Sequence, residues 1–147
     1  MEIKKLEQSY LKEFYELLKE MIAESEFNYA KLNENKIFEL FKSKDVKYFL
    51  ATKEEKIVGF IGLIKHEYFF SNRKRVSDLG FYVKTQYRGT KAALLLIKKA
   101  EEWAKSINIE DIHLGQTTAT EIEKTQKFYK KLGYKTVGFN TLKHLKD

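Results

Sequence analysis

The feature that most constrains the fold is a segment in the middle of the chain, QYRGTKAALLLIKKAEEWAKS (86–106). It reads as the end of a strand, a sharp turn at Arg88-Gly89-Thr90 and a long helix that opens on Lys91-Ala92-Ala93. A helix leaves four backbone N–H groups unpaired at its first turn, where the helix dipole is positive. The segment therefore predicts either a phosphate-binding turn or a simply capped helix.

The side chains of this turn fit both interpretations. Thr90 is expected to cap the helix or to donate its hydroxyl to a phosphate, and Arg88 and Lys91 place positive charge beside it. Neither G-x-x-x-x-G-K-S/T nor G-x-G-x-x-G occurs in the chain. Nucleotide hydrolysis and dinucleotide binding are therefore disfavoured.

Hydrophobic periodicity predicts the other elements on both sides of this segment. The order β-α-α-β-β-β-α-β-α-β-β indicates a single domain over residues 1–147, a mixed, mostly antiparallel sheet flanked by helices, of the α/β (α+β) class. A capping box at Thr120 and Glu123 starts the last helix, and Gly133 lies just past its end. The expected strands are 1–6, 46–52, 57–70, 75–84, 109–116 and a closing hairpin or two edge strands in 134–145; the other helices are 9–24, 35–44 and 120–132.

Composition narrows the class of protein. Without cysteine the chain forms no disulfide and has no thiolate, and its three scattered histidines lack metal-ligand spacing, so no metal is expected. No apolar stretch is long enough to span a membrane, which favours a cytoplasmic protein. The net charge of +7 favours either a polyanionic partner, such as nucleic acid or a phosphate-rich cofactor, or a lysine-rich solvated surface.

Four stretches, in order and spacing, resemble one family. VKTQYRGTKAALLLIKKAEEWA (83–104) is similar to the acyl-CoA-binding segment of the GNAT superfamily, the acetyl-CoA-dependent N-acetyltransferases, commonly written V-x-P-x-Y/F-R-G-x-G-I/L-G/A. EEKIVGFIGL (54–63) resembles the second strand of that family's hairpin, IHLGQT (112–117) its fifth strand, and FYKKLGY (128–134) its closing-helix signature. The resemblance spans nearly the whole chain, and the expected order of elements also agrees with it.

Three positions depart from the family pattern. Lys91 stands at the second glycine of the turn, Thr85 at the proline, and Ile122 at an asparagine that contacts the pantetheine arm in relatives. A lysine in a first helical turn keeps its backbone N–H available, and its ammonium can meet a phosphate. The R-G-x-K/R-A-A variant resembles acetyltransferase-like proteins encoded by bacteriophages.

The resemblance implies acetyl-CoA as cosubstrate and direct attack by a primary amine on the thioester. It implies that Tyr129 protonates the departing thiolate and that Asp78 is the general base, with Glu67 as the runner-up or water alone as the base. His113, on a strand that otherwise faces the core, is expected to be structural. The cofactor is expected to contact the backbone of Phe81, Tyr82 and Val83 and the turn residues Arg88, Gly89, Thr90, Lys91, Ala92 and Ala93.

The acceptor stays open between a small amine or antibiotic, a protein lysine or N-terminus, and an aminoacyl-tRNA. A catalytically inactive acyl-CoA-binding module is the second hypothesis, and a basic nucleic-acid-binding α/β domain the third. The cluster SNRKR (71–75) is expected to be a solvated hairpin tip, with contact to nucleic acid as the alternative. A homodimer is compatible with the aromatic C-terminal segment.

Overall fold

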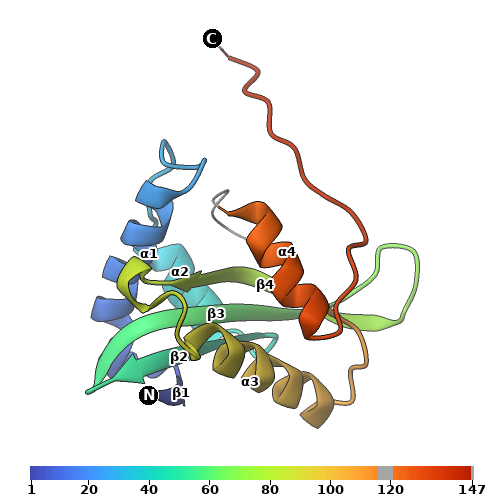
Figure 1. The fold of residues 1–147 in the computed structure, drawn as a ribbon, viewed down its shortest axis with the longest axis horizontal. Coiled ribbons are helices and arrows are strands. Elements are labelled where there is room, and N and C mark those ends of the chain that lie inside the picture. The colour runs from blue at the N-terminus through green and yellow to red at the C-terminus, as the bar shows by residue number, and fades with distance from the viewer. Residues whose placement is uncertain (116–120, 147) are drawn as a thin grey trace.

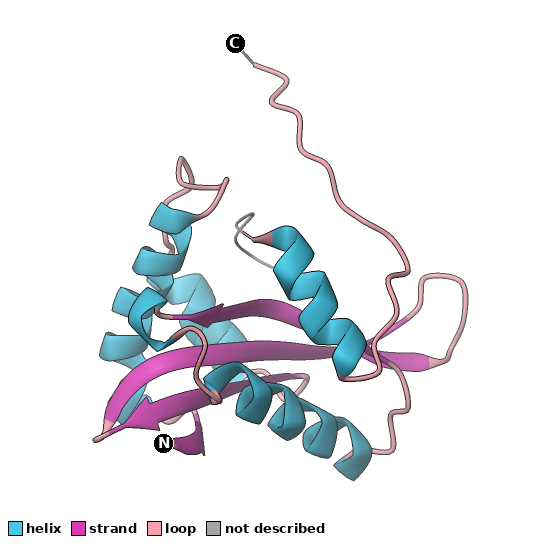
Figure 2. Ribbon diagram, viewed as in Figure 1, coloured by secondary structure: helices cyan, strands magenta, loops and turns pink. Residues whose placement is uncertain are grey.

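The computed structural model describes residues 1–115 and 121–146, which contain a five-stranded sheet and four α-helices (Figures 1 and 2). The strands are β1 (Glu2–Lys5), β2 (Val46–Lys53), β3 (Lys56–Glu67), β4 (Lys74–Val83) and β5 (Ile112–His113). The helices are α1 (Leu11–Glu24), α2 (Glu34–Lys42), α3 (Ala92–Ser106) and α4 (Ile122–Lys131), and two short 3-10 turns lie at Gln8–Tyr10 and Thr85–Tyr87. The predicted fold class is confirmed.

The sheet has the order β1-β2-β3-β4-β5. The first three pairings are antiparallel, and β4 pairs with β5 in parallel. The predicted turn at 53–56 joins β2 to β3 through Glu54 and Glu55, both with positive φ. The parallel pairing covers Val76 with Ile112 and Ser77 with His113, so β4 is paired along its length on one side and only at its start on the other.

Each face of the sheet has its own apolar core. Leu11, Phe14, Leu17 and Leu18 of α1 recur at helical spacing and are buried against one face. The Phe14 ring lies 5.1 Å from the rings of both Tyr48 and Phe60, edge to face. The opposite face packs on α3 through Leu96, Ala100 and Ala104. Burial of each large apolar side chain contributes about 1.5–3 kcal/mol, so the two helical stripes fix α1 and α3 on opposite faces.

A β-bulge interrupts the pairing of β3 with β4. Gly62 lies opposite Gly80, and Leu63 opposite Asp78, which leaves Leu79 as the extra residue. A Cβ on Gly62 would lie 2.5 Å from the Tyr48 ring, so this position requires glycine. A bulge bends its strand and re-aims the side chains next to it. The bulge at Leu79 therefore determines the direction in which the side chain of Asp78, a predicted catalytic residue, points.

The end of α4 follows the prediction. Gly133 has a φ of +93°, its N–H donates to the Lys130 carbonyl at 3.1 Å, and the Tyr134 N–H donates to the Tyr129 carbonyl at 3.0 Å. This is a Schellman motif, which glycine favours because it has no Cβ. The start of the predicted capping box, Thr120, lies outside the described residues.

The predicted closing strands are wrong. No strand follows α4 in the described residues 133–146, and Figure 2 shows this segment as a loop that leads away from the sheet. Its alternating side chains point into solvent, with Val137 72% and Phe139 88% exposed. An alternating pattern forms a strand only beside a strand with which it can pair, and β5 is two residues long where the sequence predicts a strand over 109–116.

Candidate active site

The turn before α3 is capped by its own threonine. Gly89 has a φ of +83°, a conformation that favours glycine, and the Thr90 hydroxyl donates to the Tyr87 carbonyl at 2.6 Å. The Ala92 N–H donates back to this hydroxyl at 3.3 Å. In the part of the chain that the structure describes, the N–H groups of Lys91, Ala93 and Leu94 donate to no protein acceptor. The turn is both capped and able to receive an anion.

Arg88 is already engaged by the protein. Its guanidinium lies 2.7 Å from the Glu24 carboxylate at the end of α1, and its Nε donates to the Val83 carbonyl at 2.9 Å. The Tyr82 hydroxyl donates to the same carboxylate at 2.6 Å. The hydrogen bond from Arg88 lowers the pKa of Glu24 below its ordinary value. Arg88 therefore links the turn to the end of α1, and the negative charge of Glu24 offsets much of the positive charge of Arg88.

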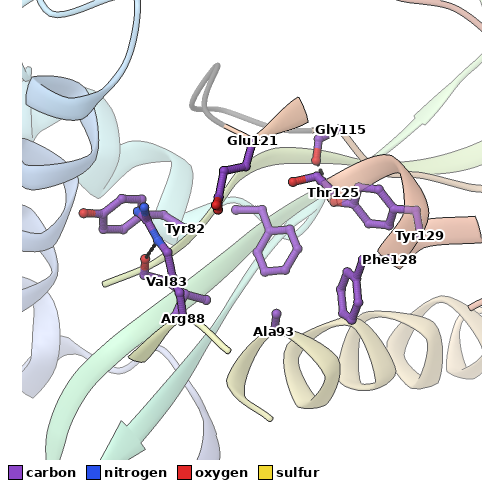
Figure 3. Close-up of a pocket in the computed structure, with 10 residues that line it drawn as sticks. Tyr82, Val83, Arg88, Ala93, Gly115, Glu121, Thr125, Phe128 and Tyr129 are labelled. Carbon is purple, nitrogen blue, oxygen red and sulfur yellow. Dashed lines mark hydrogen bonds between the residues drawn. The ribbon is translucent and has the colours of Figure 1, made fainter. Parts of the chain in front are cut away.

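A pocket of about 140 Å³ opens where β4 and β5 part (Figure 3). Its walls come from the end of β4, the first turn of α3, Gly115 and α4. That volume is below the roughly 300 Å³ of sites for drug-sized ligands, so the pocket suits a slender chain. The lining residues are Phe81, Tyr82, Val83, Arg88, Ala93, Gly115, Glu121, Thr125, Phe128 and Tyr129.

Asp78 and Tyr129 meet at Gly115. The Gly115 N–H donates to Asp78 Oδ1 at 3.1 Å, and the Tyr129 hydroxyl donates to the Gly115 carbonyl at 2.6 Å. Burial raises the pKa of Asp78 from its ordinary value of 3.8 to about 6, although the bond from Gly115 partly opposes this. Burial, and then the charge of Asp78, raise the pKa of Tyr129. The site thus pairs a carboxylate that exchanges protons near neutral pH with a phenol that stays protonated.

The structure brings most of the predicted site residues together. Phe81, Tyr82, Val83, Arg88, Ala93 and Tyr129 line one pocket, and Asp78 lies beside it. Gly89, Thr90 and Lys91 form the adjacent turn, and Ala92 is fully buried beneath it. Glu67 lies at the far end of β3 opposite Lys74, away from the pocket. His113 faces Tyr68, with its Nε2 2.9 Å from the hydroxyl.

Sequence reasoning missed several residues of the site. Gly115 lies in the stretch that resembles the family's fifth strand but contributes only its backbone, and Glu24 lies at the end of a distant helix, so no side-chain pattern indicates the role of either one. Thr125 and Phe128 precede Tyr129 by four and one positions on α4, and helical spacing from Tyr129 could have found Thr125. Figure 3 shows Glu121 directed into the pocket from the start of α4.

Two further findings concern the described residues alone. None of their helices has the length and apolar character needed to cross a membrane. They also contain no group of three or more histidine, cysteine, aspartate or glutamate side chains placed to hold a metal ion.

Solved structures share this fold over their whole length. A transcriptional regulator from Bacillus halodurans C-125 is 21% identical, with a TM-score of 0.78 and coverage of 98% of this chain and 99% of that chain. The aminoglycoside acetyltransferase meta-AAC0020 from an uncultured soil metagenomic sample, in complex with trehalose, is 18% identical, with a TM-score of 0.77 and coverage of 99% and 96%. The aminoglycoside N-acetyltransferase AAC(6')-Iy in complex with CoA is 15% identical, with a TM-score of 0.75 and coverage of 99% and 100%. No match was found among curated protein sequences.

The sequence profile of the acetyltransferase (GNAT) family matches residues 5–134, which include every strand from β2 to β5, all four helices and the pocket. This family uses acetyl-CoA, and one of the structural neighbours holds CoA, so the predicted cofactor is confirmed for the family. The parted strands, the glycine turn before α3 and the Asp78–Gly115–Tyr129 contacts all lie within the matched residues. The chain belongs to the GNAT acetyltransferase family.

Proposed function

We propose that this chain is an N-acetyltransferase that moves the acetyl group of acetyl-CoA to a primary amine by direct attack. The observation that carries the proposal is the meeting of Asp78 and Tyr129 at Gly115, beside the pocket between β4 and α4. Direct transfer needs a proton acceptor for the amine and a proton donor for the thiolate, and needs no covalent enzyme intermediate.

The described residues fit acetyl-CoA at two places. The unpaired N–H groups of Lys91, Ala93 and Leu94, with the exposed Lys91 ammonium, would hold a pyrophosphate at the start of α3. Val83, Ala93 and Phe128 line the slender pocket beyond it, which suits an apolar, flexible arm. Arg88 contributes less positive charge than the sequence predicts, because Glu24 lies against it.

We assign the two catalytic roles from the protonation states of the Asp78 carboxyl and the Tyr129 hydroxyl, which both bond to Gly115. Asp78 is buried enough to hold its proton more tightly than an ordinary aspartate, so its carboxylate is the stronger base and accepts the proton that the amine nitrogen loses as it bonds to the thioester carbon. Tyr129 stays protonated there and donates its proton to the leaving sulfur. β4 and β5 pair only as far as Ser77 and His113. Because the strands separate beyond these residues, Asp78 and Tyr129 both lie beside the pocket.

Calorimetric titration with acetyl-CoA tests cofactor binding. We expect saturable binding by the wild type and a dissociation constant about tenfold higher for Lys91→Glu, because the variant places a negative charge at the positive end of α3. Lys105→Glu makes the same charge change at the other end of the helix and should bind as the wild type does. Absence of binding at millimolar acetyl-CoA would contradict the proposal, while binding without turnover on any amine would indicate an inactive acyl-CoA-binding module.

The Asp78→Asn variant tests the effect of the Asp78 carboxylate on stability and, separately, its proposed role as the general base. The raised pKa means that the folded chain binds more protons than the unfolded chain between about pH 4 and 6, so stability falls as pH rises through this window. The variant should therefore be more stable than the wild type at pH 7.5 by about 3 kcal/mol, equally stable below pH 4, and slower in transfer by about 100-fold. Urea unfolding at pH 7.5 and below pH 4 measures the difference in the free energy of unfolding between the variant and the wild type. The same difference at both pH values would contradict a raised pKa for Asp78.

Tyr129→Phe keeps the ring and removes the hydroxyl that donates to Gly115. We expect kcat to fall about 10- to 100-fold with little change in acetyl-CoA affinity, and the free energy of unfolding to fall by about 1 kcal/mol. Tyr134→Phe is the matched control, because its hydroxyl bonds to Glu101 outside the pocket. Equal kcat values for the two variants would remove the proton-donor role from Tyr129.

A further inference from the structure

A second polar cluster lies directly behind the candidate active site. Ser77 and His113 are register partners at the point where β4 and β5 part, and Asp78 follows Ser77 in the strand. Neighbouring side chains on a strand point to opposite faces of the sheet. Ser77 therefore faces away from Asp78 and α4, toward the side of the sheet that α1 and α2 cover elsewhere.

The cluster is closely connected. His66 Nε2 lies 2.8 Å from the Ser77 hydroxyl, and the Tyr68 hydroxyl lies 2.9 Å from His113 Nε2. The guanidinium of Arg75 stacks 4.7 Å from the centre of the Tyr68 ring. Burial and then the charge of Arg75 lower the pKa of both His66 and His113. Arg75 thus lies close to both histidines, and they stay neutral beside it.

Arg75 has no carboxylate partner among the described residues. Its Nε is buried and has no hydrogen-bond partner, and it forms no ion pair in this part of the chain. Asp111, the nearby carboxylate, is taken by Arg73, whose Nε and terminal nitrogen lie 2.7 and 2.9 Å from its two oxygens. Tyr68 donates to the same carboxylate at 2.7 Å. A buried guanidinium nitrogen without an acceptor is costly, which indicates that a ligand supplies the acceptor.

We propose that Arg75, with Ser77 and the two histidines, binds a carboxylate of the amine acceptor. The inference rests on the proposed function, because acetyl-CoA would fill the pocket on the α4 face and leave the opposite face as the approach for the amine. Leu79, the bulge residue beside Asp78, is 43% exposed, so the helices leave this stretch of β4 open. The neighbouring Arg73–Asp111 pair displays the two-nitrogen fork that a carboxylate accepts.

This assignment selects one class of acceptor. The amine of the acceptor must reach Asp78, while the carboxylate of the same molecule must reach the Arg75 guanidinium on the opposite face of β4. A short amino acid or the C-terminal end of a short peptide fits this requirement best. A polycationic amine would instead meet the uncompensated charge of Arg75. The acceptors of the aminoglycoside-modifying neighbours are therefore disfavoured for this chain.

Paired acceptors test the proposal. With saturating acetyl-CoA, kcat/KM is measured for amino acids of increasing chain length and for their carboxamides, which differ only in the anionic group. We expect the acid to be preferred by about 10- to 100-fold at the best length. Arg75→Gln should reduce this ratio to about one, Arg75→Lys should leave an intermediate ratio because it keeps the charge without the fork, and the exposed neighbour Lys74→Gln should preserve it. Equal values for every pair, or a preference that survives Arg75→Gln, overturns the proposal.

A binding measurement separates this proposal from the failure of acetyl transfer. The ring signals of His66 and His113 are followed by NMR while the cofactor-free protein is titrated with butyrate and, separately, with butyramide. We expect butyrate alone to shift both histidines, and we expect Arg75→Gln, checked for native circular dichroism, to abolish the shift. Equal effects of the two compounds overturn the carboxylate site even in a protein that acetylates amines; a butyrate-specific shift supports it even where no turnover is found.

Discussion

The site depends on the unequal pairing of β4. This strand pairs with β3 from Lys74 to Val83, but with β5 only at Val76 and Ser77. The bulge at Leu79 falls just where the second pairing ends. Beyond it, the strand supplies the wall of a pocket instead of a sheet interior. The residues of the proposed cofactor pocket on β4, Phe81 to Val83, lie beyond that point, and Asp78 lies directly beside it.

The elements around the parting are held by contacts that are distant in sequence. Glu24 binds both Arg88 and the Tyr82 hydroxyl, so the end of α1 fixes the turn before α3 and the end of β4 together. Gly115 links β4 to α4 through Asp78 on one side and Tyr129 on the other. Breaking a charged pair in such a partly buried setting is costly, since it leaves the remaining group without its partner. The end of β4 that borders the pocket is consequently held by contacts on both faces of the sheet.

The two faces of the parted strands differ in chemistry. The face toward α4 carries a carboxylate with a raised proton affinity and a tyrosine that keeps its proton. The face toward α1 and α2 carries an arginine between neutral histidines. Alternation along β4 places these two environments on successive residues, Ser77 and Asp78. An acceptor that bridges them would present its amine to one face and its anionic group to the other.

Local patterns in the sequence predicted the helices, the hairpin and the two glycine-dependent turns, because each depends on neighbours within one turn or strand. The resemblance of 83–104 and 128–134 to family motifs located Tyr129 and the α3 turn. The engagement of Arg88 by Glu24 and the role of the Gly115 carbonyl could not be predicted, since both join distant segments and one uses only backbone. The prediction of closing strands in 134–145 is wrong for a related reason. Val137 and Phe139 alternate as in a strand, but the described part of the sheet offers them no partner of sufficient length.

Amide mapping of the isotopically labelled protein during titration with CoA tests the central claim most directly. If the pocket between β4 and α4 and the start of α3 form the cofactor site, the largest shifts will fall on residues 81–83, 89–94 and 125–129. The amides of β1 and of α2 should stay unchanged, since both lie away from the parted strands. Shifts centred elsewhere on the chain, or saturation without any change at residues 89–94, would contradict the account.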